Sequence, residues 1–439
     1  TNGRGCSDSS FCLRSILQSL REHGHTSWVC FIDLVKAFDS VDREALCAIL
    51  KKYGCPEALV NVVKAMHENV IVRMVEEDDV IEFLSTLGVL QGAAVSPALF
   101  LFVIQAWFET MPWPTRDIIF KCNDGSCEQH ELPGGKLNAH VIGRACNDKG
   151  TSFSVGDTLY ADDAALITLG RENMERTLKA LIKHGKRWGL EVHVAKKASG
   201  SSKTELIVVE PAEHHPNRRA ADYAPPDKSP VQVGENAFIT HACVKIGGEK
   251  RHGVFKYLGS YIAEDMREDT DVDARILAAS KAFGRFSKSI FRNKNISLEA
   301  KARAFSAFVL SILLYQTEIY ALRRDLVAKF QRFLNDKIRA MTGVSRMRQW
   351  KHHTTCPHLA ADLGLRSAAS YLDERALKWA GHVARMEPHR LARKCLFGWT
   401  DGKRASGRPQ QTFRHRLKSL LDKVVAVGIR RMHDEAKHA

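Results

Sequence analysis

The chain has 439 residues, 44% of them hydrophobic, which suffices for two or three domains; its longest apolar stretch, near residues 98–108, is too short to cross a bilayer, and no segment resembles a secretory signal peptide. Its eleven cysteines are an odd number without a repeating framework, which argues against a disulfide scaffold and for a reduced intracellular setting. The net charge of +15 comes from residues 281–439, which hold 33 Lys and Arg against 12 Asp and Glu, whereas residues 1–280 hold 32 against 38; this asymmetry favours a polyanion partner such as nucleic acid, with a solvated helical surface as the alternative.

The first 110 residues predict alternating strands and helices. Residues 28–34 (WVCFIDL) are apolar and β-prone, and they predict a buried strand that ends in an acid. The elements expected after it are helices over residues 42–53 and from Pro56, strands over 70–75 and 80–87 around an acidic turn, a loop over 88–96, and an apolar helix from Pro97.

The middle of the chain predicts further strands, and its last third predicts helices. Residues 111–155 are rich in Gly, Asn, Asp and Cys and predict an insertion or irregular segment. The elements expected next are a hairpin over 157–169 (DTLYADDAALITL), an amphipathic helix over 171–188, a strand over 204–209, a Pro-rich surface loop over 211–232, and mostly helices beyond 270. The order predicts an α+β fold followed by a mostly helical part, without internal repeats.

The hairpin contains two adjacent carboxylates, Asp162 and Asp163, between apolar runs. Such a pair is costly unless a cation compensates its charge, and Mg²⁺ is commonly held by one or two carboxylates together with substrate phosphates. Adjacent residues on a regular strand point to opposite faces, so a tight turn is where both acids could approach one metal site. An ordinary acidic hairpin tip is the alternative.

A third carboxylate, Asp33, ends the first predicted strand. Three such groups could form a two-metal site, in which one ion activates an attacking 3′-hydroxyl and the other stabilises the leaving pyrophosphate. Asp39 competes for this assignment, and the sequence leaves the choice open. Its other expected role is a helix N-terminal or salt-bridging acid.

Five segments in order carry a family resemblance: DLVKAFDSV, LGVLQGAAVSPALF, YADD, SKTE and FKYLGS. They resemble the successive palm motifs of reverse transcriptases, most closely those of the non-LTR, LINE-type retrotransposon family. The likeness runs from about residue 2 to residue 262. Within residues 379–414, WAGHVARM and GKRASGRPQQTF also resemble the C-terminal region of LINE-type proteins.

The resemblance implies a right-hand polymerase of the α+β class, whose palm is an antiparallel sheet packed on helices. The implied divisions are partial fingers over residues 1–27, a palm over 28–265 with an insertion at 111–155 and a Pro-rich loop at 211–232, a helical thumb over 270–350, and a basic C-terminal region over 351–439. Basic segments at 285–303, 323–348 and 403–418 are candidates for tracking phosphates.

The implied activity is RNA-directed DNA synthesis, in which dNTPs extend a DNA primer on an RNA template with two Mg²⁺ ions, for which Mn²⁺ could substitute. Because such elements integrate into chromosomes, a nuclear location follows from the resemblance. No membrane partner is expected, and the sequence identifies no protein partner. Since the chain starts at Thr1 and its fingers motif at once, we expect a fragment of a longer protein.

Site residues follow motif by motif. The resemblance implies metal-binding catalytic aspartates at Asp33, Asp162 and Asp163, an aromatic steric gate at Phe38, a nucleotide and template pocket at Gln91 and Gly92, a lysine near the triphosphate at Lys203, and a primer grip at Tyr257, Leu258 and Gly259. Residues 195–202 lengthen the loop before Lys203, so Lys196 or Lys197 could take its part. Without the motifs, Phe38 would be a core residue and the Gln91-Gly92 segment a helix-entry loop.

Other functions stay open at this point. The main alternative is a catalytically inactive, truncated retroelement protein that only binds nucleic acid; an RNA-directed RNA polymerase and a metal nuclease are further alternatives. Two thin Cys/His clusters could hold zinc, one at Cys122, Cys127, His130, His140 and Cys146 and one at His352, His353, Cys356 and His358.

Overall fold

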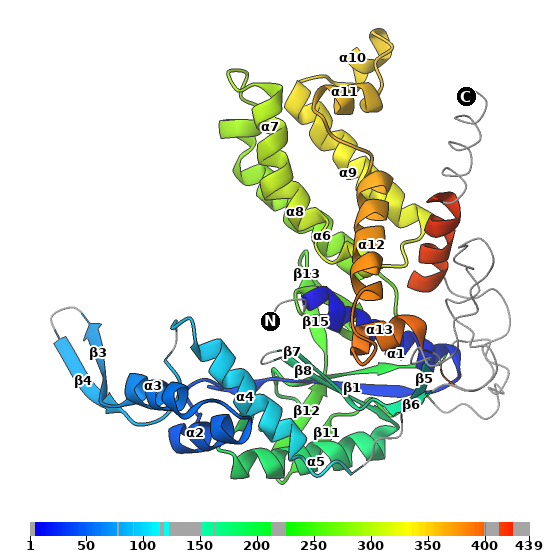
Figure 1. Ribbon diagram of the computed structural model, residues 1–439. Coiled ribbons are helices and arrows are strands. Elements are labelled where there is room, and N and C mark those ends of the chain that lie inside the picture. Colours follow the sequence, from blue (N-terminus) through cyan, green and yellow to red (C-terminus); the bar gives the residue numbers. More distant parts are fainter. Residues whose placement is uncertain are drawn as a thin grey trace, which may run out of the picture.

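The structure is a computed structural model. It describes residues 5–76, 79–90, 92–114, 118–122, 151–160, 163–211, 225–398, 400 and 412–424. These residues form a central sheet, a lobe that projects from one side of it, and a tall group of helices above it (Figure 1). In this part of the chain, no helix is both long and apolar enough to span a membrane.

Six strands form the central sheet, in the order β11-β12-β10-β1-β8-β7. Their bounds are β1 Ser27–Ile32, β7 Asp157–Tyr160, β8 Asp163–Leu169, β10 Glu205–Val209, β11 Val231–Gly234 and β12 Ala237–His241. β1 pairs antiparallel with both β8 and β10, and all six of its residues are buried. A strand flanked and covered in this way needs the continuous apolar run that the sequence provides.

The expectation of an antiparallel sheet is wrong at one pair, because β10 and β12 run parallel. Parallel neighbours need a long crossover connection, whereas antiparallel neighbours can share a short turn. The chain from residue 210 to residue 236, which includes the Pro-rich segment, supplies that length. The sheet is therefore mixed, with β11 added at its edge by an antiparallel pairing to β12.

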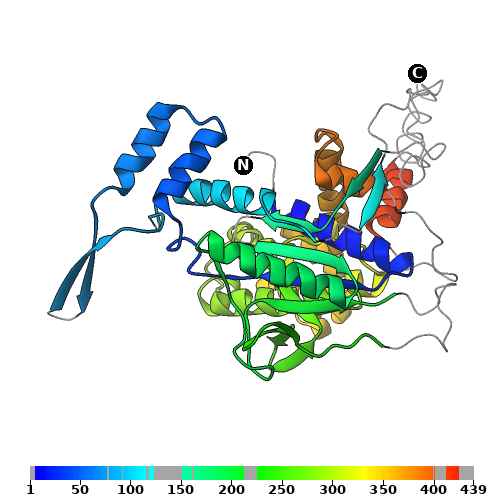
Figure 2. The same cartoon turned by 90° about the horizontal axis from the view of Figure 1, so that it is seen from below.

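Side chains alternate across the sheet into two cores. The upper core lies between the sheet and α1 (Cys6–Glu22) and continues into the helices above; the lower core lies against α4 (Ser96–Glu109) and α5 (Arg171–Arg187). Phe31 belongs to the upper core, and Trp28 belongs to the lower one. Seen from below, α5 crosses the face of the sheet opposite the helical group (Figure 2).

The projecting lobe consists of α2 (Arg43–Lys52), α3 (Glu57–His67), β3 (Val70–Glu76) and β4 (Asp79–Ser85), at the left of Figure 1. These elements confirm the two helices and the strand pair expected there. Asp42 caps α2 by accepting a hydrogen bond from the Ala45 amide at 2.8 Å.

Several short strand pairs surround the sheet. They are β2 (Leu34–Val35) with β9 (Glu191–Val192), β5 (Ile119–Cys122) with β6 (Thr151–Ser154), β13 (Cys243–Ile246) with β14 (Glu249–His252), and β15 (Val254–Tyr257) with β16 (Ser260–Ala263). The β5–β6 pair shows that the segment expected to be irregular has a regular ladder at its two ends. Residues 123–150 lie outside the described residues.

The described residues beyond 268 are mostly helical, as expected. In order they are α6 (Asp269–Arg285), α7 (Leu298–Phe305), α8 (Ser311–Leu313), α9 (Arg324–Thr342), α10 (Arg346–Lys351), α11 (Cys356–Asp362), α12 (Ala368–Ala384) and α13 (Leu391–Phe397), with a further helix over residues 413–424. Short π-helical turns, Ser287–Phe291 and Ser306–Leu310, and the 3₁₀ turn Thr317–Ile319 connect some of them. The apolar face of α9, which includes Phe330 and Met341, is buried.

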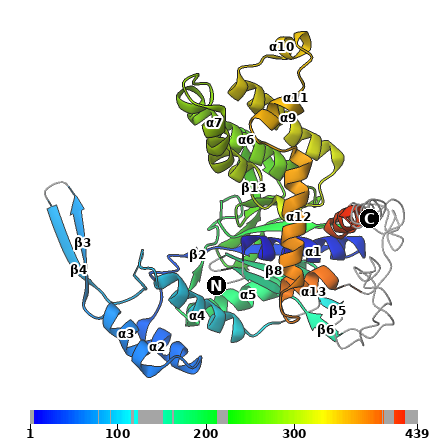
Figure 3. The ribbon, with the colours of Figure 1, turned by 45° about the horizontal axis from the view of Figure 1, so that its top comes forward.

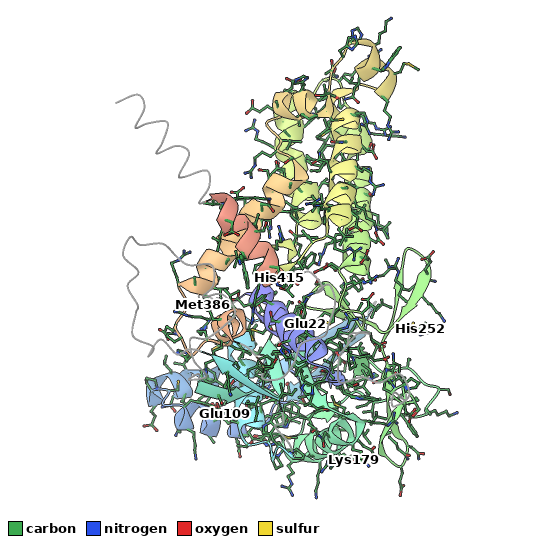
Figure 4. All side chains as sticks on the ribbon, turned by 90° about the vertical axis from the view of Figure 1, so that its right-hand side faces the viewer. Glu22, Glu109, Lys179, His252, Met386 and His415 are labelled. Carbon is green, nitrogen blue, oxygen red and sulfur yellow. The ribbon has the colours of Figure 1, made fainter. Side chains whose placement is uncertain are left out.

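The described C-terminal helices return to the central part of the molecule and pack against α1. Trp379 of α12 packs between Phe11 of α1 and Phe413, with ring centroids 4.5 and 5.4 Å away. The Trp379 indole N–H also donates to Asp8 at 3.0 Å. Arg416 is buried and donates to the carbonyl oxygen of Tyr320 at 2.8 Å. In Figure 4 these helices stand beside α1, on the side where Met386 and His415 are labelled.

Candidate active site

The β1–β8 register brings Asp33 and Asp163 to the same end of the two strands. The last pair of this antiparallel ladder is Ile32 with Ala164; Asp33 follows Ile32 along the chain, and Asp163 precedes Ala164. Tyr160 pairs with Asp163 across the β7–β8 hairpin, which leaves two residues for the turn. The second of these, Asp162, lies outside the described residues.

Strand alternation, extended by one residue beyond β1, assigns the side chains of Asp33 and Asp163 to the upper face of the sheet. The residues of the three central strands that enter the upper core are Val29 and Phe31 on β1, Ala165 and Ile167 on β8, and Ile207 and Val209 on β10. Because side chains alternate along a strand, Asp33 and Asp163 continue the first two series. Lys203 and Glu205 continue the third.

An ion pair agrees with this placement. The Nζ atom of Lys203 lies 3.9 Å from Oδ2 of Asp33, and the two side chains are 72% and 41% exposed. Solvent and ligands can therefore reach both groups. Exposed pairs of this kind contribute little to stability, so the pairing matters for the charge balance of the site more than for the fold.

The backbone of Asp33 is fixed by its neighbours on both sides. Its amide donates to Oγ1 of the buried Thr204 at 3.1 Å, and its carbonyl oxygen accepts a hydrogen bond from the His193 amide at 2.9 Å. The His193 ring in turn accepts from the amide of Lys203 at 3.2 Å. The SKTE segment thus holds Asp33 in place through Thr204 and places Lys203 beside it.

The β7–β8 hairpin is tied to α1. The Tyr257 hydroxyl lies 3.0 Å from the Ser9 hydroxyl on α1 and 3.3 Å from the Thr158 hydroxyl on β7, and burial raises the pKa of Tyr257 to about 12. A hydrogen bond with the Cys6 thiol, and burial, raise the pKa of Tyr160 to about 12. Both tyrosines are therefore neutral at physiological pH and act as hydrogen-bonding groups.

The turn of the β15–β16 hairpin is held by the helices above it. Leu258 and Gly259 have φ values of 49° and 79°, a pair of left-handed residues typical of a tight two-residue hairpin turn. The Leu258 carbonyl accepts from the Tyr315 hydroxyl at 3.1 Å and from the Gln316 side chain at 2.9 Å. A Cβ atom on Gly259 would come within 3.3 Å of the Tyr315 ring, so this position favours glycine.

Phe38 and Gly92 lie in two segments that abut. The Phe38 ring stacks on Phe100 of α4 at 4.6 Å and stays partly exposed, so it is both a packing residue and accessible. Its carbonyl oxygen accepts a hydrogen bond from the Val89 amide at 2.9 Å. Gly92 is exposed with φ +86°, and Gln91 lies outside the described residues.

Asp39, the competitor of Asp33, occupies a different place. It lies in the turn after β2, with its amide donating to the Lys36 carbonyl, and its backbone touches the loop at Gly88. A Cβ atom on Gly88 would come 2.8 Å from the Asp39 Cα atom. Asp39 lies seven residues beyond Ile32, the last residue of β1 in the β1–β8 ladder, whereas Asp33 follows Ile32 directly.

Two residues of the site escaped sequence reasoning. Arg43 donates hydrogen bonds to the carbonyl oxygens of His67, Ser85, Leu87 and Gly88, and it thereby joins α2 and α3 to the end of β4 and to the loop before Gly92. Glu205, the last residue of SKTE, pairs with Phe31 across the strands, and burial raises its pKa to about 7. Strand alternation could have identified Glu205, whereas only the fold identifies Arg43.

The donor set suits a hard divalent cation. Asp33 and Asp163 offer carboxylate oxygens at an accessible end of the β1–β8 ladder. Mg²⁺ and Mn²⁺ prefer such oxygen ligands over nitrogen or sulfur ligands. A cluster of three or more His, Cys, Asp or Glu side chains fit to hold a metal is not found among the described residues, which do not include Asp162. The candidate zinc cluster around Cys356 lies within the described residues, where no such metal-binding group is found. The candidate cluster that starts at Cys122 lies mostly outside the described residues.

Comparison with known proteins supplies the family. Residues 2–260 match the profile of the family described as "Reverse transcriptase (RNA-dependent DNA polymerase)". The chain is also 28% identical over 109 residues to the "Retrovirus-related Pol polyprotein from type-2 retrotransposable element R2DM" of Drosophila melanogaster. That similarity covers 25% of this chain and 10% of the fly protein, so the matched segment spans about a tenth of the length of that relative. Because the profile match spans more than half of the sequence, the chain belongs to the reverse transcriptase family.

Proposed function

We propose that this chain is the polymerase part of a non-LTR retrotransposon protein and extends a DNA primer on an RNA template. The observation that supports the proposal is that Asp33 and Asp163 both lie at the end of the β1–β8 ladder, where Lys203 is 3.9 Å from Asp33. Clustered carboxylates with an adjacent cation suit nucleotidyl transfer, in which a protein mainly positions groups and neutralises charge.

Asp33, Asp162 and Asp163 would hold the cations. Bound Mg²⁺ ions would make the 3′-hydroxyl of a primer more acidic and would neutralise charge on the departing pyrophosphate. The rigid backbone of Asp33, bonded to Thr204 and His193, supports such a role because it fixes one carboxylate before substrate arrives. The exposed ammonium of Lys203, which lies 3.9 Å from Asp33, would turn toward a triphosphate.

The other motif residues would shape the substrate site. Phe38, whose ring stacks on Phe100, would collide with a ribose 2′-hydroxyl and so would select deoxynucleotides. Gly92, with Gln91, would line the nucleotide and template pocket, where an exposed glycine allows a close approach of ligand to backbone. The β15–β16 turn at Tyr257, Leu258 and Gly259 would hold the primer end.

The arrangement of the three parts supports the same proposal. The projecting lobe extends to one side of the sheet, and the helical group rises above the sheet (Figure 3). We propose that the sheet corresponds to a palm and the helices α6 to α10 to a thumb, and that the projecting lobe, which the resemblance assigned to the palm, corresponds to fingers. The thumb begins where the negative part of the chain gives way to the basic part, which favours phosphate contacts there.

Primer extension tests the proposal. A DNA primer annealed to an RNA template is incubated with Mg²⁺ and either dNTPs or rNTPs, using wild type, Asp33→Asn and the matched control Asp39→Asn. We expect extension by the wild type with dNTPs in preference to rNTPs, a loss of at least about 100-fold in Asp33→Asn, and a far smaller loss in Asp39→Asn.

Two outcomes would contradict this proposal. Equal extension by the wild type and Asp33→Asn would defeat the assignment of the site, and a preference for rNTPs would favour an RNA polymerase. Salt-sensitive RNA binding by the wild type without any extension would instead favour the inactive, nucleic-acid-binding alternative.

A further inference from the structure

The most exposed large apolar side chains of the described residues sit together on α10. Trp350 is 77% exposed and Met347 is 72% exposed, and none of the residues of this helix is buried. The two residues are three apart, so they are neighbours on one side of the helix. α10 protrudes at the far end of the helical group, away from the sheet (Figure 1).

This tip has a defined base despite its exposure. The Ser345 hydroxyl caps α10 by accepting from the Arg348 amide at 3.2 Å. Below it, the Gln349 side chain and the Arg339 guanidinium both approach the Cys356 sulfur at 3.3 Å. These contacts join α9, α10 and α11, so the exposed indole stands on an anchored segment.

The tip is also basic. Residues 344–355 contain Arg346, Arg348 and Lys351 and no Asp or Glu, and all three cations are exposed. Arg346 lies 3.6 Å from Asp336 of α9, which orients one cation at the edge of the tip. A flat aromatic ring flanked by cations matches the pairing of base stacking with phosphate neutralisation that binds single-stranded nucleic acid.

We propose that the α10 tip is a binding surface for single-stranded RNA, with an unpaired base stacked on Trp350 and neighbouring phosphates near Arg348 and Lys351. A duplex hides the faces of its bases, whereas an unpaired strand offers them to an aromatic side chain. The protruding tip presents an exposed indole ring on which a flat base can stack. RNA is the strand assigned because the proposed function, on which this inference rests, gives the enzyme a template that is unpaired before it is copied.

Binding measurements on the full chain test the tip separately from catalysis. A fluorescent 12-nucleotide single-stranded RNA, a DNA oligonucleotide of the same sequence and an RNA–DNA duplex are titrated with wild type, Trp350→Ala and Trp350→Phe. We expect Trp350→Ala to weaken RNA binding by roughly 5- to 100-fold and duplex binding by less than about 2-fold. Trp350→Phe, which keeps a ring, should recover most of the affinity.

A second variant tests the cations of the tip. Replacement of Arg348 and Lys351 by glutamine should reduce the slope of log K against log salt concentration by about 1.4, since each phosphate contact of a single strand contributes about 0.7. An unchanged slope would mean that these cations do not face phosphates, and it would overturn their part of the proposal.

The results separate this inference from the proposed function. Unchanged RNA binding in Trp350→Ala, an equal loss for the duplex, or a loss confined to DNA would each overturn the tip assignment, even if the wild type extends primers. A selective loss of RNA binding supports the tip even if no extension is seen. Because Trp350 is largely exposed, its replacement should leave the melting temperature unchanged, and a drop would invalidate the surface assignment.

Discussion

At the residue scale, the candidate site could be predicted only where motif and strand geometry act together. The sequence indicated Asp33 and, about 130 residues later, the adjacent pair Asp162 and Asp163, and the β1–β8 register brings Asp33 and Asp163 to the same end of the two strands. Asp162 and Gln91 lie outside the described residues, so their roles stay predictions. Arg43 could not be predicted because its partners are backbone carbonyls, which no side-chain pattern reveals.

Glu205 gives the site region a predictable pH dependence. Burial raises its pKa from 4.5 to about 7, so between these values the folded chain binds a proton that the unfolded chain has released. The free energy of unfolding therefore falls as the pH rises through this window, and above it the destabilisation caused by the buried carboxylate is constant. In Glu205→Gln the titrating group is gone.

We expect the melting temperature of Glu205→Gln relative to wild type to increase from pH 5 to pH 8. Thermal unfolding followed by circular dichroism at several pH values measures this difference. Exposed Glu191→Gln, on β9, serves as the control and should show no such trend. A difference that stays constant with pH would mean that Glu205 titrates normally and is not held in a desolvated position.

At the element scale, periodicity predicted most helices and strands but not how they meet. The helix over residues 171–188 and the β7–β8 hairpin were predicted within one or two residues, because each carries its own apolar pattern. The parallel β10–β12 pair and the return of α12 to α1 were not predictable, since the partners are long-range and local pattern does not specify them.

The contact of α12 with α1 should matter for stability. Trp379 is 8% exposed and packs against Phe11 and Phe413, so Trp379→Ala should leave a cavity and cost about 3 kcal/mol of unfolding free energy. Urea unfolding monitored by circular dichroism measures this cost. Trp350→Ala is the matched control, because the same substitution at a 77% exposed site should cost almost nothing. Equal effects at the two positions would show that α12 does not share the upper core.

At the scale of the whole molecule, the net charge changes from negative to positive near residue 280, close to where the helical part of the chain begins. The part with a net charge of −6 contains the sheet and its acids, and the part with a net charge of +21 contains most of the helices above it. The sequence could predict this division and the order of α+β before α. It could not predict that the basic C-terminal helices also complete the core over α1, because a charge count does not distinguish an exposed helix face from a buried one.

The proposed polymerase function depends on a cation site at the end of the β1–β8 ladder, near Asp33 and Asp163. The most direct test replaces Mg²⁺ by Fe²⁺, which generates hydroxyl radicals with ascorbate and peroxide and cuts the nearby backbone. We predict cuts close to residues 33 and 163 that excess Mg²⁺ suppresses and that Asp33→Asn weakens. Cuts elsewhere in the chain, or cuts at these positions that persist unchanged in Asp33→Asn, would contradict the account.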